Sequence, residues 1–178
     1  MLPAQPQQPA DSNYCSMQLK PDLSEAEKFL SYLSGTKDIT ETIFTFQTFS
    51  DREELKNENY DPNAKVIIGT LALHAGTLAE LNQKGVGVFV TINETDGMGR
   101  KKDNIIKVRA NFADLDGAPL GPVEKHSLKP HIINETSPGK YHVYYIAEGV
   151  PLEEFSNIQK GTFYGTDTER KSDCAVSF

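Results

Sequence analysis

The order in which helix-like and strand-like segments follow one another most constrains the fold of this chain. Apolar residues recur at helical spacing in some segments, and β-branched and aromatic residues concentrate in shorter ones. The spacing predicts helices over residues 24–34, 70–84 and 151–160 and strands over 42–49, 86–93, 105–114, 131–135 and 141–147. This order predicts an α+β fold with its helices mainly on one face of a mostly antiparallel sheet.

The N-terminal region divides into a tail and a capped helix. Residues 1–20 are rich in proline and glutamine and offer almost nothing to bury, so we expect a disordered tail there and a folded domain over 21–178. Ser24 followed by Glu27 matches a capping box, and Gly35 stands where a C-terminal cap belongs. These signals predict a first helix that begins at the start of the domain.

Composition excludes several classes of protein. The 178 residues carry a net charge of −7, and no stretch approaches the ~18 apolar residues of a spanning helix. The first residues lack the basic and apolar regions of a secretion signal, and Cys15 and Cys174 form neither a disulfide framework nor a zinc spacing. We therefore expect a cytoplasmic protein without a membrane association, and one too acidic to coat nucleic acid generally.

The segment 112–119 (FADLDGAP) contains two aspartates at the end of a predicted strand. Residues i and i+2 of a strand face the same side, so Asp114 and Asp116 would repel each other unless a cation lay between them. Mg²⁺ or Mn²⁺ prefers such carboxylates and shares them with substrate phosphates. Because alternation also puts them on the face of Phe112, this hypothesis needs a twist or bulge near that residue. The alternative is a plain turn before Gly117.

The segment 136–144 (TSPGKYHVY) predicts a tight turn between two strands. Ser137 and Lys140 lie in the turn, and His142 follows in the second strand. A hydroxyl, free backbone amides, an ammonium group and an imidazole together favour a phosphate site. The alternative is an ordinary hairpin in which His142 is a surface residue.

A basic stretch precedes the two aspartates. Residues 100–110 hold five basic side chains and one acid, Asp103, in an otherwise acidic chain. Two hypotheses are balanced here: a solvated loop, or a clamp on template or triphosphate in which Arg100 and Arg109 contact phosphates. The glycines Gly97 and Gly99 are too few for a phosphate-binding loop motif.

Together these segments resemble the RepB-like DNA primase domain, a branch of the archaeo-eukaryotic primase superfamily found in plasmids, phages and prophages. The similarity covers about residues 25–165 and is carried by 87–100 (GVFVTINETDGMGR), 108–119 (VRANFADLDGAP) and 137–142 (SPGKYH). It implies an RRM-like antiparallel palm sheet joined to an N-terminal αβ unit. It also implies a nucleotidyltransferase that uses nucleoside triphosphates and a single-stranded DNA template, with a helicase or replication-initiation partner.

The resemblance assigns roles to matching residues. Asp114 and Asp116 would bind catalytic Mg²⁺ or Mn²⁺, and His142 would contact the phosphates of the incoming nucleotide with Ser137 and Lys140 as accessory groups. The family's third motif, an acidic residue followed by arginines and Pro-Gly, is not matched after about residue 167, and Asp173 is the nearest acid. We therefore expect a domain that is incomplete at its C-terminal end and weakly active or inert.

Two other functions compete with this interpretation. The run Asp114-Leu-Asp116-Gly also resembles the nucleophile motif of haloacid-dehalogenase-like phosphatases, in which Asp114 would attack phosphorus and Asp116 would serve as acid and base. The second alternative is a non-catalytic remnant that retains the palm and binds DNA. These are hypotheses of different classes, and nucleotide incorporation, phospho-aspartate formation and DNA binding alone distinguish them.

Overall fold

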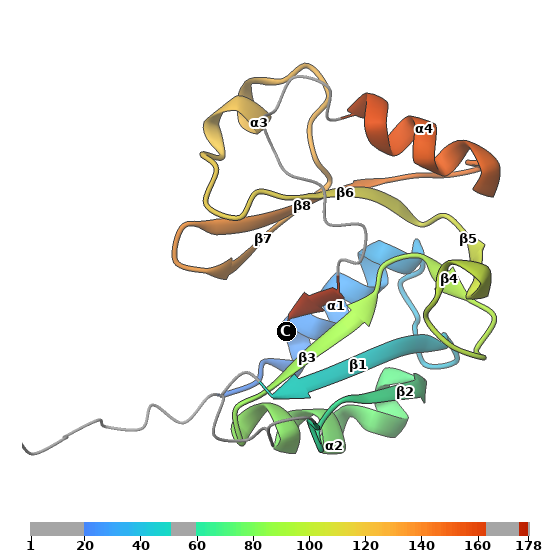
Figure 1. Ribbon diagram of the computed structural model, residues 1–178, viewed down its shortest axis with the longest axis vertical. Coiled ribbons are helices and arrows are strands. Elements are labelled where there is room, and N and C mark those ends of the chain that lie inside the picture. Colours follow the sequence, from blue (N-terminus) through green and yellow to red (C-terminus); the bar gives the residue numbers. More distant parts are fainter. Residues whose placement is uncertain (1–19, 51–59, 163–174, 178) are drawn as a thin grey trace, which may run out of the picture.

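The computed structural model describes residues 20–50, 60–162 and 175–177 (Figure 1). The N-terminal part contains α1 (Leu23–Ser34), β1 (Phe44–Ser50), β2 (Lys65–Gly69), α2 (Leu71–Gln83) and β3 (Val86–Thr91). A small hairpin of β4 (Glu94–Thr95) and β5 (Ile105–Lys107) encloses the short 3₁₀ helix Lys102–Asn104. The C-terminal part contains β6 (Ala110–Asp114), α3 (Gly121–Lys125), β7 (Ile132–Ser137), β8 (Lys140–Ile146), α4 (Leu152–Thr162) and β9 (Ala175–Ser177).

The strands form three sheets, and each recorded pairing is antiparallel. The first has the order β2-β1-β3-β9, the second is the β4–β5 hairpin, and the third has the order β6-β8-β7. In Figure 1, α3 and α4 lie on one side of the β6-β8-β7 sheet, and α1 with the four-stranded sheet lies on the other. The α+β class is thus confirmed.

One hydrophobic core joins the two larger sheets through α1. It combines Leu30 and Leu33 of α1 with Phe46 of β1, Val90 of β3 and Tyr144 of β8, all at most 1% exposed. Phe46 and Val90 are paired across the sheet, so their side chains meet the helix from adjacent positions. A second, smaller cluster packs α3 against the opposite face of β6 and β8.

An amide side chain from α4 closes the outer edge of β6. Gln159 accepts a hydrogen bond from the backbone N–H of Phe112 at 3.2 Å and donates one to the carbonyl of the same residue. An edge strand exposes such groups to solvent unless they are covered. The amide satisfies both groups as a neighbouring strand would, and it ties α4 to the sheet.

Several local features differ from the sequence predictions. The cap of α1 is Asp22, whose carboxylate accepts from the N–H groups of Ser24 and Glu25, so the predicted capping box is wrong, whereas Gly35 does end the helix at φ 72°. The strands β2 and β9 and the short helix α3 were not predicted, and the predicted strand 105–114 is two strands in different sheets. The predicted tail over 1–20 lies outside the described residues except at its last position.

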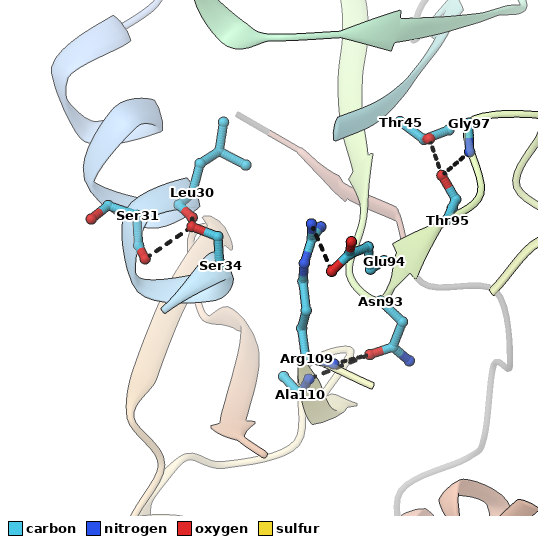
Figure 2. A network of polar contacts seen from close by, with 10 residues as sticks. All are labelled: Leu30, Ser31, Ser34, Thr45, Asn93, Glu94, Thr95, Gly97, Arg109 and Ala110. Carbon is cyan, nitrogen blue, oxygen red and sulfur yellow. Dashed lines mark hydrogen bonds and ion pairs between the residues drawn. The ribbon is translucent and has the colours of Figure 1, made fainter. Parts of the chain in front are cut away.

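The break between β5 and β6 has a clear cause in Asn93. Its side-chain Oδ1 accepts hydrogen bonds from the backbone N–H groups of Arg109 at 2.9 Å and Ala110 at 3.3 Å (Figure 2). These two N–H groups lie where the chain passes from β5 to β6, and the Asn93 side chain accepts a hydrogen bond from each of them. The β6–β8 register is regular from Ala110 to Asp114, so the twist or bulge expected near Phe112 is absent from this ladder, and Asp114 shares the face of Phe112.

Within residues 20–50, 60–162 and 175–177, none of the helices combines the length and apolar character needed to cross a bilayer.

Candidate active site at the β6–β8 strand pair

The ladder between β6 and β8 brings the two sequence motifs together. Asp114, the last residue of β6, is the register partner of His142 on β8. The Oδ1 atom of Asp114 lies 3.4 Å from Nε2 of His142, and the two side chains are 23% and 13% exposed. A carboxylate and an imidazole that are 28 residues apart in the chain thus meet at one strand end.

Asp116 leaves the strand in a turn rather than continuing along it. Its backbone has φ 37°, a left-handed value that a non-glycine residue rarely adopts, and its N–H donates to Oδ1 of Asp114 at 2.9 Å. The turn therefore exists as the alternative hypothesis expected.

Lys140 pairs with Asp116 across the same strand end. Its ammonium Nζ lies 3.1 Å from Oδ1 of Asp116, and both side chains are more than half exposed. Lys140 opens β8 directly after the β7–β8 turn, where it is the register partner of Ser137, and Gly139 completes the turn at φ 76°. The predicted tight turn is confirmed, and it places an exposed cation next to the aspartates.

The side chain of His142 is largely buried, which contradicts the alternative of an ordinary hairpin with His142 on its surface. Its Nδ1 atom lies 3.3 Å from the hydroxyl of Tyr144, which is fully buried, while Nε2 faces Asp114. Burial lowers the pKa of His142, and the Asp114 carboxylate partly opposes that fall. The imidazole is therefore harder to protonate than a free histidine, and each of its nitrogens faces a polar partner.

The described part of the chain supplies two carboxylates for a cation here. Among residues 20–50, 60–162 and 175–177, no three His, Cys, Asp or Glu side chains gather into a ready-made metal site. Oδ1 of Asp114 accepts from the Asp116 N–H and faces His142, so Oδ2 is the oxygen that could take a cation. Asp173, the acid considered for a third ligand, lies outside the described residues.

The structure separates the two arginines from this site. Arg100 is exposed on the loop of the β4–β5 hairpin, which precedes the start of β6, whereas Asp114 ends that strand. Arg109 is buried, and its NH2 atom lies 3.5 Å from Oε2 of Glu94 (Figure 2). Its guanidinium lies over the ring of Phe44, 5.2 Å from the ring centroid. Arg109 is thus a core residue and not a surface contact for phosphate.

The burial of the Arg109 guanidinium explains why it is paired with an acidic residue, Glu94. Burial lowers the pKa of the guanidinium, and the charge of Glu94 opposes that fall. The resulting ion pair links the β4–β5 hairpin to the core under α1. Sequence reasoning missed Glu94, because pairing across the hairpin brings it near Arg109 from 15 positions earlier.

Sequence reasoning also missed Tyr144 as a partner of His142. The i and i+2 spacing of the two residues on one strand was the available signal, since it puts both side chains on one face.

Comparisons of the chain with protein-family models, with curated proteins and with solved structures found no match.

Proposed function

We propose that this domain is a nucleotidyltransferase of the DNA primase and polymerase type, acting in replication of a plasmid, phage or other mobile element. Asp114 and Asp116 would bind Mg²⁺ or Mn²⁺ together with a nucleoside triphosphate, and Lys140 and His142 would contact its phosphates. Ser137, exposed opposite Lys140 in the turn, is an accessory donor. Single-stranded DNA is the proposed template, and a helicase or initiation protein the proposed partner.

The observation that carries this proposal is the meeting of both motifs at one strand end. Asp114 with Asp116 and Lys140 with His142 come from separate segments, and two contacts of 3.4 and 3.1 Å join them. The phosphatase hypothesis uses only the first segment and gives Lys140 and His142 no task. The nucleotidyltransferase hypothesis needs all four residues in one place.

The donor set fits a cation that arrives with its nucleotide. Mg²⁺ usually takes one or two carboxylates from a protein and completes its ~6 oxygen ligands with water and phosphates. Asp114 Oδ2 and the exposed Asp116 carboxylate can supply that share. When bound, such ions stabilise negative charge on the attacking and leaving oxygens.

The chain's own residues would position the substrate. Lys140 carries the mobile positive charge of the site, so it would exchange its contact with Asp116 for a phosphate oxygen. His142, whose pKa is lowered by burial, would donate a hydrogen bond, and Tyr144 would hold its ring orientation. Such positioning supplies most of the catalysis in phosphoryl transfer.

The test combines binding with catalysis in the full chain. Calorimetry with MnCl₂ and a nucleoside triphosphate should show binding that an Asp114→Asn, Asp116→Asn variant loses. The same pair of proteins should differ in Mn²⁺-dependent incorporation of labelled nucleotide on a primed template. Glu153→Gln, Glu154→Gln on α4 removes two exposed carboxylates as a matched control.

Each possible result decides between hypotheses. Unchanged metal affinity in the aspartate variant would remove this site. A phospho-aspartate trapped at Asp114 would favour the phosphatase, and DNA binding without either activity would favour the non-catalytic remnant.

A further inference from the structure

Within the β4–β5 hairpin, exposed positive charge gathers at residues 100–102 and 107, alongside the exposed acids Asp96 and Asp103. The side chains of Arg100, Lys101, Lys102 and Lys107 are all exposed, whereas the chain as a whole carries a net charge of −7. Arg109, the remaining basic residue of this stretch, is buried and paired with Glu94. The exposed cations are thus separate from the charge that stabilises the core.

The loop that carries these cations is held in one shape by its own side chains. Asn104 accepts from the backbone N–H of Lys101 at 3.1 Å and donates to the carboxylate of Asp96 at 3.3 Å. The backbone N–H of Asp96 in turn donates to the carbonyl of Asn104 at 2.8 Å. Gly99 allows this close approach, because a Cβ there would meet Oδ1 of Asn104 at 2.7 Å.

The hairpin is also anchored to the main sheet. The hydroxyls of Thr95 and Thr45 lie 2.6 Å apart, which joins β4 to the buried strand β1 (Figure 2). A basic loop that is only solvated needs neither this anchor nor the internal bonds. Preorganisation instead lowers the ordering cost of binding a large partner.

Exposed apolar side chains accompany the cations. Met98 is 82% exposed in the loop and Ile106 is 53% exposed on β5. The hairpin contains no aromatic residue on which an unpaired base could stack, which disfavours single strands as its ligand. A two-stranded β-ribbon fits a DNA groove, basic side chains contact the phosphates, and apolar residues such as Met or Ile wedge against base steps.

We propose that the β4–β5 hairpin, residues 94–107, is an anchor for double-stranded DNA that lies outside the candidate active site. The hairpin ends before β6 begins, whereas Asp114 is the last residue of β6. The five residues of that strand span about 14 Å, so the length of β6 separates the hairpin from Asp114. The inference deepens the proposed function, because it gives the domain a contact for duplex DNA near the site of synthesis. Its chemistry does not require Asp114 or Asp116.

The test measures binding alone, without nucleotide or divalent ion. Fluorescence anisotropy of a labelled 20-base-pair duplex should show that Arg100→Gln, Lys101→Gln, Lys102→Gln binds on the order of 100-fold more weakly at 0.1 M salt. Loss of three phosphate contacts should also reduce the slope of log affinity against log salt by about 2.7. A matched variant with the same charge change, Lys37→Gln, Lys84→Gln, Lys160→Gln, should bind as the parent does.

The other outcomes overturn the inference. Equal losses in the hairpin and matched variants would show that only net charge matters. Tighter binding to a 20-base single strand, or to vesicles containing phosphatidylserine, would assign the hairpin to a different partner. If the hairpin result holds but the aspartate variant keeps full metal affinity, duplex binding stands and the proposed function fails.

Discussion

Asp114 and His142 face each other across the β6–β8 ladder, with Oδ1 and Nε2 3.4 Å apart. Tyr144 contacts the other ring nitrogen of His142, so the imidazole is bracketed by a carboxylate and a phenol. A surface histidine in a hairpin would have neither partner. This arrangement is the basis for assigning the strand end, rather than the loops, as the candidate site.

The protonation of His142 is the first quantity to measure. Burial lowers its pKa and Asp114 opposes that fall, so NMR titration should give a pKa below the usual value of about 6.5. Asp114→Asn should lower it further, because the favourable charge is gone. Glu148→Gln, at an exposed position beyond β8, serves as the control and should leave it unchanged.

Stability should depend on pH through the same residue. Since the unfolded chain protonates His142 more readily, its contribution to the free energy of unfolding is fully present above about pH 6.5 and is lost as pH falls toward the lowered folded pKa. The free energy of unfolding, measured by urea titration at several pH values, should fall with decreasing pH more steeply in the parent than in His142→Gln over that interval. Parallel pH profiles would contradict the assignment.

Lys140 should compete with divalent cations for Asp116. Its ammonium lies 3.1 Å from Oδ1 of Asp116, so Lys140→Gln should raise Mn²⁺ affinity by about two- to fivefold in calorimetry. Affinity for a nucleoside triphosphate should fall, because a phosphate contact is lost. Lys160→Gln is the matched control, and a lower metal affinity in Lys140→Gln would refute the competition.

The ion pair of Arg109 should matter for folding and not for nucleotide binding. Glu94→Gln leaves a buried cation without its partner and should cost about 2–3 kcal/mol in urea unfolding. Arg109→Met should cost less, since a thioether packs against Phe44 and the partly exposed Glu94 can reach water. Nucleotide affinity in Arg109→Met should stay within about twofold of the parent, provided the variant is folded.

Gln159 should protect the edge of β6. In hydrogen-exchange NMR the Phe112 amide should be protected in the parent and lose that protection in Gln159→Leu, with a loss of about 1–2 kcal/mol in stability. Gln159→Glu keeps an acceptor for the Phe112 N–H but not the donor to its carbonyl, so its protection should be intermediate. Equal protection in all three proteins would mean that α4 does not hold this edge.

The shape of the hairpin loop should affect duplex binding without any change of charge. A Cβ at Gly99 would meet Asn104, so Gly99→Ala should displace the loop and weaken duplex affinity by about three- to tenfold. Gly121→Ala is the control, because a Cβ there has no neighbour within 4 Å. Equal affinity in both variants would show that the loop geometry is not used.

Sequence reasoning predicted the α+β class because periodicity and caps are local signals. The apolar residues of α1 recur on the face that it buries, and Gly35 marks a turn that favours glycine. The strands β3 and β8 are short runs of β-branched and aromatic residues, most of them buried. The short strand β2 and the helix α3 escaped prediction, because five residues contain too few repeats to define a period. The RRM-like arrangement stays a prediction.

The sequence by itself determined which chemical groups are available: an Asp-Leu-Asp turn, a Lys and His pair, and a basic stretch in an acidic chain. Tertiary structure alone decided which of them meet. The β6–β8 register joins Asp114 to His142 and buries that imidazole. Asn93 binds the backbone where β5 gives way to β6, and Arg109 lies in the core whereas Arg100 is exposed. The physical reason is that strand pairing and burial depend on residues far apart in the chain, and no local pattern of side chains encodes a register between them.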